Sequence, residues 1–260
     1  MSFIKVGDFK IGFTQAGNND ENLPLVFLHG VGSDKSVWDF QLRELSKSRR
    51  VFAFDYPGYS ESDLPLNDLS RAEVARYIFG AMDALKIQKA HVCGLSMGGV
   101  IAFEMFAQNP KPIASLILAN TFAKHPNGVE IVERSINFIK THSMREFAEQ
   151  RSNFLLAPQT SKETRSKVVE TMARIDKRTY AWASKAVWMA DYLELLPKIN
   201  VPALVIGGEL DQPTPTELSK QLAEGIANAK LEIIKNAAHL SNLDEPQIFN
   251  RLVEKFIEEN

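Results

Sequence analysis

The chain has 260 residues, 45% of them apolar, and its 30 lysines and arginines nearly balance its 32 aspartates and glutamates. A net charge of −2 provides no overall field to attract nucleic acid or anionic lipid, so we expect a small-molecule partner. Cys93 is the only cysteine, which excludes an internal disulfide and a multi-cysteine metal site. No apolar run is long enough for a signal peptide or a membrane span, which predicts a cytoplasmic protein.

Short apolar runs alternate with amphipathic segments along most of the chain, as in parallel strands joined by crossover helices. A hairpin is predicted at residues 2–16, and buried strands at 23–28 and 50–54. Ser70 and Glu73 form a capping box that predicts the start of the next helix. We therefore predict an α/β fold in which helices flank a mostly parallel central sheet.

A short turn motif follows the next predicted strand. Residues 94–99 read Gly-Leu-Ser-Met-Gly-Gly, after the apolar run at 90–93 and before a helical segment. A strand that turns directly into a helix strains the corner residue, and the flanking glycines leave room for it. The motif thus predicts that Ser96 is an exposed nucleophile. The backbone N–H of Met97 would point at the group that Ser96 attacks.

The alternation stops after a predicted strand at 113–118. Helical segments then follow one another from 121 to 196, which predicts a helical cap insertion, or lid, in a core domain made of 1–120 and 197–260. Capping boxes are predicted at Ser143 with Glu146 and at Thr160 with Glu163, and an apolar helix face at Val129, Val132, Ile136 and Ile139.

The insertion carries large apolar side chains that would form a roof over Ser96. Two of them, Trp182 and Trp188, are predicted to contact the substrate, although packing within the insertion explains most residues of this kind. Any of three arginines could bind a substrate carboxylate, and the sequence does not choose among Arg145, Arg151 and Arg174. The other roof candidates are Phe122, Phe138, Phe147, Phe154 and Met189.

A serine hydroxyl needs a base to take its proton and an acid to orient that base. Among five histidines, His239 is the predicted base, because it lies in a polar loop after the last predicted strand, 231–234. Asp211 is the predicted acid, because it follows the strand at 201–206 and catalytic groups gather at the carboxyl ends of parallel strands. Glu209 is the nearest alternative.

Two further polar positions bear on the same region. The predicted strand at 113–118 leads into Asn120, so no carboxylate is available there to act as the acid. Thr214, Pro215 and Glu217 stand in the order of cap, proline and acid, which predicts a helix capped by Thr214.

The order Ser96, Asp211, His239 resembles that of the α/β-hydrolase fold superfamily, and the resemblance spans nearly the whole chain. His29-Gly30-Val31-Gly32 is similar to that family's oxyanion loop. The resemblance implies that the Val31 and Met97 amides form the oxyanion hole, and that His29 and Gly30 lie against the substrate. Residues 55–62 are similar to the family's D-x-[RP]-G-x-G-x-S loop, with Ser60 in place of a glycine.

Two stretches, 93–99 and 238–246, resemble those of 3-oxoadipate enol-lactonases and related small carboxylesterases. The chain departs from those lactonases in Gly30, where serine is frequent, and in Pro57, where arginine is usual. Residues 55–58 look more like those of meta-cleavage-product hydrolases, which cut carbon–carbon bonds. Those hydrolases usually carry tryptophan where this chain has Leu240.

Together these features predict a serine hydrolase that cleaves a small carboxylic ester or enol-lactone through an acyl-enzyme, with no metal or organic cofactor. The chain would act as a monomer or homodimer. Carbon–carbon bond hydrolysis, or perhydrolysis as in cofactor-free haloperoxidases, could use the same three residues. A non-catalytic ligand receptor with this fold is the alternative from a different class.

Overall fold

The computed structural model describes residues 2–260. Its eight strands form one sheet in the order β1-β2-β4-β3-β5-β6-β7-β8. β2 pairs antiparallel with β1 and β4, whereas every pairing from β4 to β8 is parallel, so the predicted fold class is confirmed. The strands are β1 (Ser2–Val6), β2 (Phe9–Ala16), β3 (Leu25–Leu28), β4 (Val51–Phe54), β5 (Ala90–Leu95), β6 (Ile113–Ala119), β7 (Ala203–Gly208) and β8 (Ala229–Ile234).

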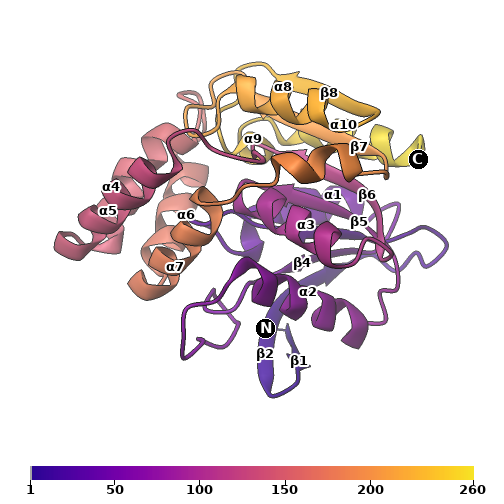
Figure 1. Ribbon diagram of the computed structural model, residues 1–260, viewed down its shortest axis with the longest axis horizontal. Coiled ribbons are helices and arrows are strands. Elements are labelled where there is room, and N and C mark those ends of the chain that lie inside the picture. Colours follow the sequence, from indigo (N-terminus) through magenta and orange to yellow (C-terminus); the bar gives the residue numbers. More distant parts are fainter. Residues whose placement is uncertain (1) are drawn as a thin grey trace.

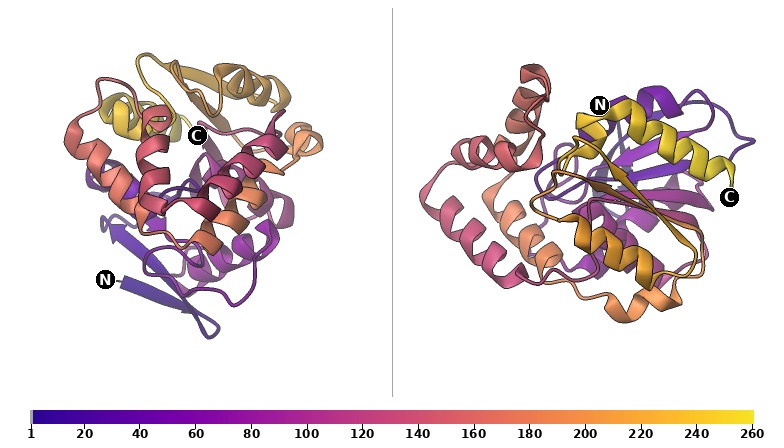
Figure 2. Two further views of the ribbon diagram at one scale, coloured as in Figure 1. Left: turned by 90° about the vertical axis from the view of Figure 1, so that its left-hand side faces the viewer. Right: turned by 90° about the horizontal axis from the view of Figure 1, so that it is seen from above.

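Helices cover both faces of the sheet because each crossover between parallel strands places its helix on one face. α1 packs against α10, and α2 packs against α3. The right-hand view of Figure 2 shows α10 and α8 on opposite sides of the strands. These helices are α1 (Asp39–Leu45), α2 (Arg71–Ala84), α3 (Met97–Gln108), α8 (Thr216–Gly225), α9 (Ser241–Asp244) and α10 (Pro246–Glu258), and a 3-10 turn, η1 (Lys35–Trp38), precedes α1.

Four helices follow one another between β6 and β7, where the sequence predicts an insertion without strands. Figures 1 and 2 show them projecting together from one side of the sheet. α4 packs on α7, and α5 packs on α6. The helices are α4 (Gly128–Thr141), α5 (Met144–Leu155), α6 (Lys162–Ala173) and α7 (Lys177–Trp188), and a second 3-10 segment, η2 (Leu193–Lys198), leads into β7. We call α4–α7 the helical insertion.

Two local predictions within the insertion need correction, one at a helix cap and one at a single residue of a helix face. Ser161, not Thr160, caps α6, because the Thr160 hydroxyl instead binds the Asp244 carboxylate. On α4 the predicted apolar face is present at Val132, Ile136 and Ile139, whereas the side chain of Val129 is exposed and Ile131 is buried in addition. The capping boxes of α2 and α5 are present as predicted.

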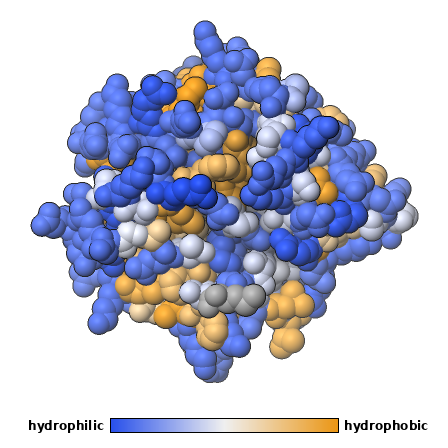
Figure 3. Space-filling model, turned by 180° about the vertical axis from the view of Figure 1, so that it is seen from behind, coloured by the Kyte–Doolittle hydropathy of each residue, from blue (hydrophilic) through white to orange (hydrophobic). Residues whose placement is uncertain are grey.

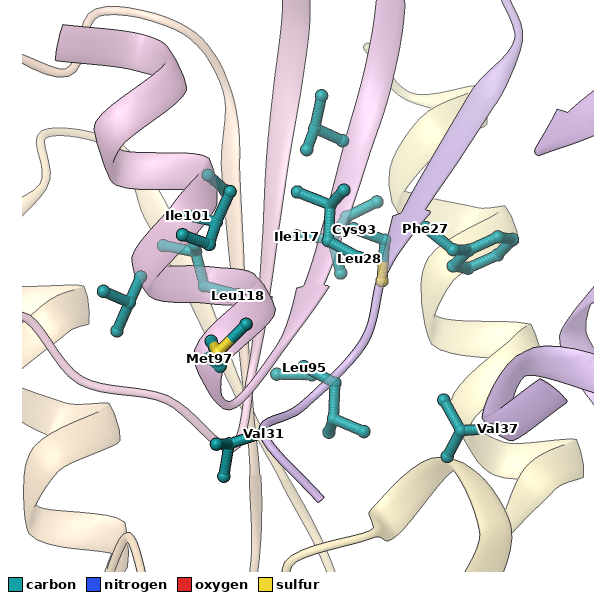
Figure 4. Packing of buried hydrophobic residues seen from close by; sticks show 14 of the residues in the cluster. Phe27, Leu28, Val31, Val37, Cys93, Leu95, Met97, Ile101, Ile117 and Leu118 are labelled. Atoms are coloured by element: carbon teal, nitrogen blue, oxygen red, sulfur yellow. The ribbon is translucent and has the colours of Figure 1, made fainter. Parts of the chain in front are cut away.

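The core lies on both sides of the central strands, and every residue of β3, β4, β5 and β7 is buried. Figure 4 shows apolar side chains such as Phe27 and Ile117 packed between these strands and their helices. One outer face, seen in Figure 3, is mainly hydrophilic and has apolar areas in its lower part. Within residues 2–260, no helix is both long and apolar enough to cross a membrane.

Candidate active site

Ser96 occupies the sharp corner between β5 and α3. Its backbone has φ 55° and ψ −114°, a region that costs a non-glycine residue about 1–3 kcal/mol. The corner is tight because Gly94 and Gly98 touch their neighbours closely. A Cβ on Gly94 would lie 2.3 Å from the carbonyl carbon of Gly98, and one on Gly98 would lie 2.0 Å from the carbonyl oxygen of Leu28. The strained corner that the motif predicts is therefore present, but Ser96 is buried, with 3% of its surface exposed, where the sequence predicted an exposed residue.

His239 and Asp211 form a buried pair on the loops that follow β8 and β7. The Nδ1 atom of His239 lies 3.1 Å from each carboxylate oxygen of Asp211, and the two side chains are 4% and 0% exposed. Burial by itself raises the pKa of the Asp211 carboxyl. The neighbouring His239 and hydrogen bonds from Thr214 and Asn120 outweigh it and hold that pKa below its usual value. Asp211 is thus an anion suited to orient an imidazole.

Asn120 and Thr214 hold Asp211 in place, and neither was predicted to do so. The Asn120 Nδ2 atom donates to Oδ2 of Asp211 at 2.8 Å. The Thr214 amide donates to Oδ1 at 2.8 Å, and its hydroxyl donates to Oδ2 at 2.6 Å. The prediction that Thr214 caps α8 is consequently wrong, since α8 begins at Thr216 after Pro215.

The other acid that the sequence offers, Glu209, faces a different partner. Its carboxylate accepts a hydrogen bond from the Asn236 amide at 2.9 Å, in an exposed position.

The role of Asn120 could have been predicted from the sequence, because an amide at the end of a strand beside Asp211's strand can donate to a buried carboxylate. Its own Oδ1 accepts from the Ser241 hydroxyl at 2.5 Å, which sets the direction of the amide.

Ser96 and His239 line one small inner cavity, together with Gly30 and Val31. The cavity holds about 20 Å³, which is room for about one water molecule. Figure 4 shows Val31 just past the end of β3 and Met97 in the first turn of α3. Among residues 2–260, neither the Val31 nor the Met97 amide donates to a backbone acceptor. Both amides remain available to a negatively charged oxygen, as the oxyanion-hole prediction requires.

A larger pocket of about 640 Å³ lies beside the inner cavity, between the insertion and the loop after β7. Arg151 of α5 and Trp188 at the end of α7 line both spaces and form the wall between them. Both side chains carry a buried N–H donor without a partner among the described residues, Nε of Arg151 and Nε1 of Trp188. Three of the predicted roof residues also line the larger pocket, namely Phe138, Phe147 and Phe154.

Of the predicted substrate contacts, Gly30 and Trp188 line the inner cavity, whereas His29 and Trp182 do not. Trp182 precedes Trp188 by six residues on α7. At about 100° per residue, the two side chains point to different sides, and Trp182 borders a surface cleft with Met189. His29 is fully buried outside the cavity. Neither side chain lines the inner cavity, so substrate contact by His29 and Trp182 stays a prediction that the cavity lining does not support.

The remaining insertion residues separate clearly by position. Phe122 stacks on Trp188, with ring centroids 5.3 Å apart, and supports it without lining either space. The Arg145 guanidinium pairs with the Glu170 carboxylate at 2.7 Å on the surface. Arg174 lines neither space. Arg151 is thus the one of the three candidate arginines that reaches the site.

Comparison with known proteins gives one consistent result. Residues 24–246 match the family described as the alpha/beta hydrolase fold. The chain is 29% identical to 3-oxoadipate enol-lactonase 1 of Acinetobacter baylyi, over 92% of this chain and 91% of that one. It is 28% identical to a 2-hydroxy-6-oxononadienedioate/2-hydroxy-6-oxononatrienedioate hydrolase of Cupriavidus pinatubonensis, over 98% and 93%. The crystal structure of the enol-lactonase from Burkholderia xenovorans superimposes with a TM-score of 0.92 at 27% identity, covering 99% and 100% of the two chains.

Proposed function

Because this chain belongs to the alpha/beta hydrolase fold family, we propose that it is a serine hydrolase that cleaves a small carboxylic ester or lactone. The observation that carries the proposal is the buried contact between His239 and Asp211 beside a strained Ser96 that lines the same cavity as His239. Strain of this kind at a residue with a nucleophilic side chain is characteristic of functional sites.

In the proposed reaction, the Oγ atom of Ser96 attacks the substrate carbonyl carbon while Nε2 of His239 takes the hydroxyl proton. Asp211 keeps the proton on Nδ1 of His239 and stabilises the imidazolium. The amides of Val31 and Met97 donate to the carbonyl oxygen as it becomes negative. His239 then protonates the leaving group, and a water that it deprotonates releases the acid from Ser96.

The wall between the two spaces supports a substrate that carries a carboxylate. On folding, the unpaired N–H donors of Arg151 and Trp188 each lose a hydrogen bond to water and gain no replacement. Each such buried donor lowers the free energy of unfolding by about 1–3 kcal/mol. An anionic group beside the scissile bond would satisfy both donors. Since the inner cavity holds about one water, such a substrate must displace part of this wall or extend into the larger pocket.

A second candidate uses the same three residues to hydrolyse a carbon–carbon bond. It draws on the relative from Cupriavidus pinatubonensis, whose identity of 28% nearly equals the 29% of the enol-lactonase relative. A substrate panel separates the two: short nitrophenyl esters, an enol-lactone and a vinylogous diketo acid. Turnover of the esters or the lactone supports the first candidate. Turnover of the diketo acid alone supports the second.

Replacing Ser96 by alanine tests the nucleophile that both candidates share. The Ser96→Ala variant is expected to lose about 10⁴-fold or more in kcat for the best substrate of the panel, with an unchanged circular dichroism spectrum. Ser219→Ala is the matched control, since Ser219 is a buried serine of α8 whose hydroxyl has no partner among residues 2–260. Undiminished turnover by Ser96→Ala would refute the assignment of Ser96 as the nucleophile.

A fluorophosphonate probe distinguishes a working hydrolase from a receptor with the same fold. The proposal expects added mass on Ser96 of the wild-type chain and none on the Ser96→Ala variant. A wild-type chain that stays unlabelled under conditions that label a known serine esterase would support the receptor alternative.

A further inference from the structure

We propose that His29 is a positioning residue that sets the direction of the Val31 amide through the carbonyl group of Gly30. The inference rests on the proposed function, in which that amide binds the oxyanion. The side chain of His29 does not line the cavity and packs against the rings of Tyr56 and Tyr59, at centroid distances of 4.3 and 4.9 Å. Its role must therefore act through another group.

The hydrogen bonds of His29 define which nitrogen carries its proton. The backbone amide of Tyr56 donates to Nε2 at 3.3 Å, so Nε2 is the acceptor. Nδ1 then carries the proton and donates to the carbonyl oxygen of Gly30 at 2.8 Å. Complete burial lowers the pKa of His29 and outweighs the opposing effect of Asp55, which keeps the ring neutral and the two nitrogens distinct.

The Gly30 carbonyl and the Val31 N–H belong to the same planar peptide group and point in opposite directions. A donor that holds the carbonyl oxygen therefore also sets the direction of the N–H of Val31, a residue that lines the same cavity as Ser96. The Ser33 amide donates to the same oxygen at 3.2 Å. A hydrogen bond to the carbonyl oxygen also polarises the peptide group, which strengthens the hydrogen bond that the N–H of the same peptide donates by about 10–30%.

The next peptide group of the loop has a different support. The Tyr59 hydroxyl donates to the carbonyl oxygen of Val31 at 2.9 Å, and that carbonyl shares its peptide with Gly32 rather than with the oxyanion donor. Tyr59→Phe removes this bond and keeps the ring that packs on His29. It is therefore a matched control for general loosening of the loop.

Two variants of His29 test the role because they place an amide at different points. The side-chain nitrogen of asparagine can stand near the position of Nδ1, whereas that of glutamine reaches the position of Nε2. We expect His29→Gln to lower kcat by about 10-fold, less than the 10²–10³-fold loss of an oxyanion donor, with little change in KM. His29→Asn should retain most of the activity, and Tyr59→Phe should lose less than His29→Gln.

A boronic acid that forms a tetrahedral adduct with Ser96 gives a second measurement that packing alone would not change. Its affinity should fall in His29→Gln by the same factor as kcat, while the melting temperature changes little. Equal losses in the glutamine, asparagine and Tyr59→Phe variants would overturn the proposal. So would a loss of kcat without a loss of boronate affinity.

The tautomer can be read on the wild-type protein without any substrate, so this result is separate from whether the chain hydrolyses esters. Nitrogen-15 NMR of labelled imidazole is expected to show a proton on Nδ1 of His29 and none on Nε2. A proton on Nε2 would overturn the proposal even if every His29 variant failed to fold. Absence of Ser96-dependent turnover, with Nδ1 protonated, would instead count against the proposed function.

Discussion

At the scale of single residues, the corner at Ser96 depends on the absence of side chains around it. α3 starts immediately at Met97, so its first turn lies against the end of β3. Gly98 is the point of contact, because a Cβ on this residue would lie 2.0 Å from the carbonyl oxygen of Leu28. Because the obstacle is backbone in a fully buried strand, it cannot rotate away as a flexible side chain could.

We expect Gly98→Ala to destabilise the protein by about 3 kcal/mol, since overpacking against backbone displaces the helix or the strand. Urea unfolding measures the change, and kcat should fall with it because the Met97 amide moves. Gly7→Ala is a suitable control, because Gly7 has φ +61° but open space around its Cβ position, so only about 1 kcal/mol is expected. Equal effects in the two variants would contradict the packing explanation.

At the scale of elements, one carboxylate connects the helical insertion to the loop that carries His239. Asp244, at the end of α9, accepts hydrogen bonds from the Ala238 amide at 2.8 Å and from the Ala157 amide at 3.1 Å. The Leu240 amide also donates to the Leu155 carbonyl at 2.9 Å. The C-terminal end of α5 and the His239 loop are thus held against each other on both sides of His239.

Removing this carboxylate should affect both stability and catalysis. Asp244→Ala leaves two backbone amides without their acceptor, and we expect a loss of about 2–4 kcal/mol in the free energy of unfolding. The kcat should also fall, because the His239 loop loses one support. Glu245→Ala is the matched control, since the Glu245 side chain makes no hydrogen bond or ion pair among the described residues. Comparable losses in both variants, by urea unfolding, would refute this role of Asp244.

At the scale of the whole molecule, stability depends on how buried histidines titrate when the chain unfolds. His91 lies in β5 at the centre of the sheet and is 3% exposed, with Nδ1 2.8 Å from the Ser115 hydroxyl. Burial, with smaller effects of Arg49 and Lys89, lowers the pKa of His91 to about 4. Folded His91 therefore stays neutral at a pH where the unfolded chain takes up a proton.

The direction in which stability changes with pH follows from that difference in proton uptake. Between pH 6.5 and pH 4 the unfolded state binds more protons at His91 than the folded state does. The contribution of His91 to the free energy of unfolding is therefore complete above pH 6.5 and is lost as the pH falls. We expect wild-type protein to lose about 2 kcal/mol more between pH 7 and pH 5 than His91→Gln does. Urea unfolding at both pH values measures this. His142→Gln, at an exposed histidine, should keep the wild-type dependence, and an equal loss in wild type and His91→Gln would contradict the prediction.

Much of the architecture could be predicted because its signals are local. Apolar runs and helical periodicity indicate the strands and helices, and the glycines around Ser96 predict a tight corner. The predicted hairpin at 2–16 appears as β1 and β2, and the start of α2 follows its capping box. The order of Ser96, Asp211 and His239 along strands of known direction was enough to expect Asp211 and His239 at one end of the sheet.

The sequence by itself determined the α/β fold class and where the nucleophile turn would lie, since each depends on residues a few positions apart. Only the tertiary structure decided that Asn120 and Thr214 hold Asp211, that Arg151 is the arginine at the cavity, and that His29 is buried outside the cavity lining. The reason is that a loop side chain turns toward whichever donor or acceptor lies nearest. For Asn120 that acceptor is 91 residues away along the chain, where no local pattern can reveal it.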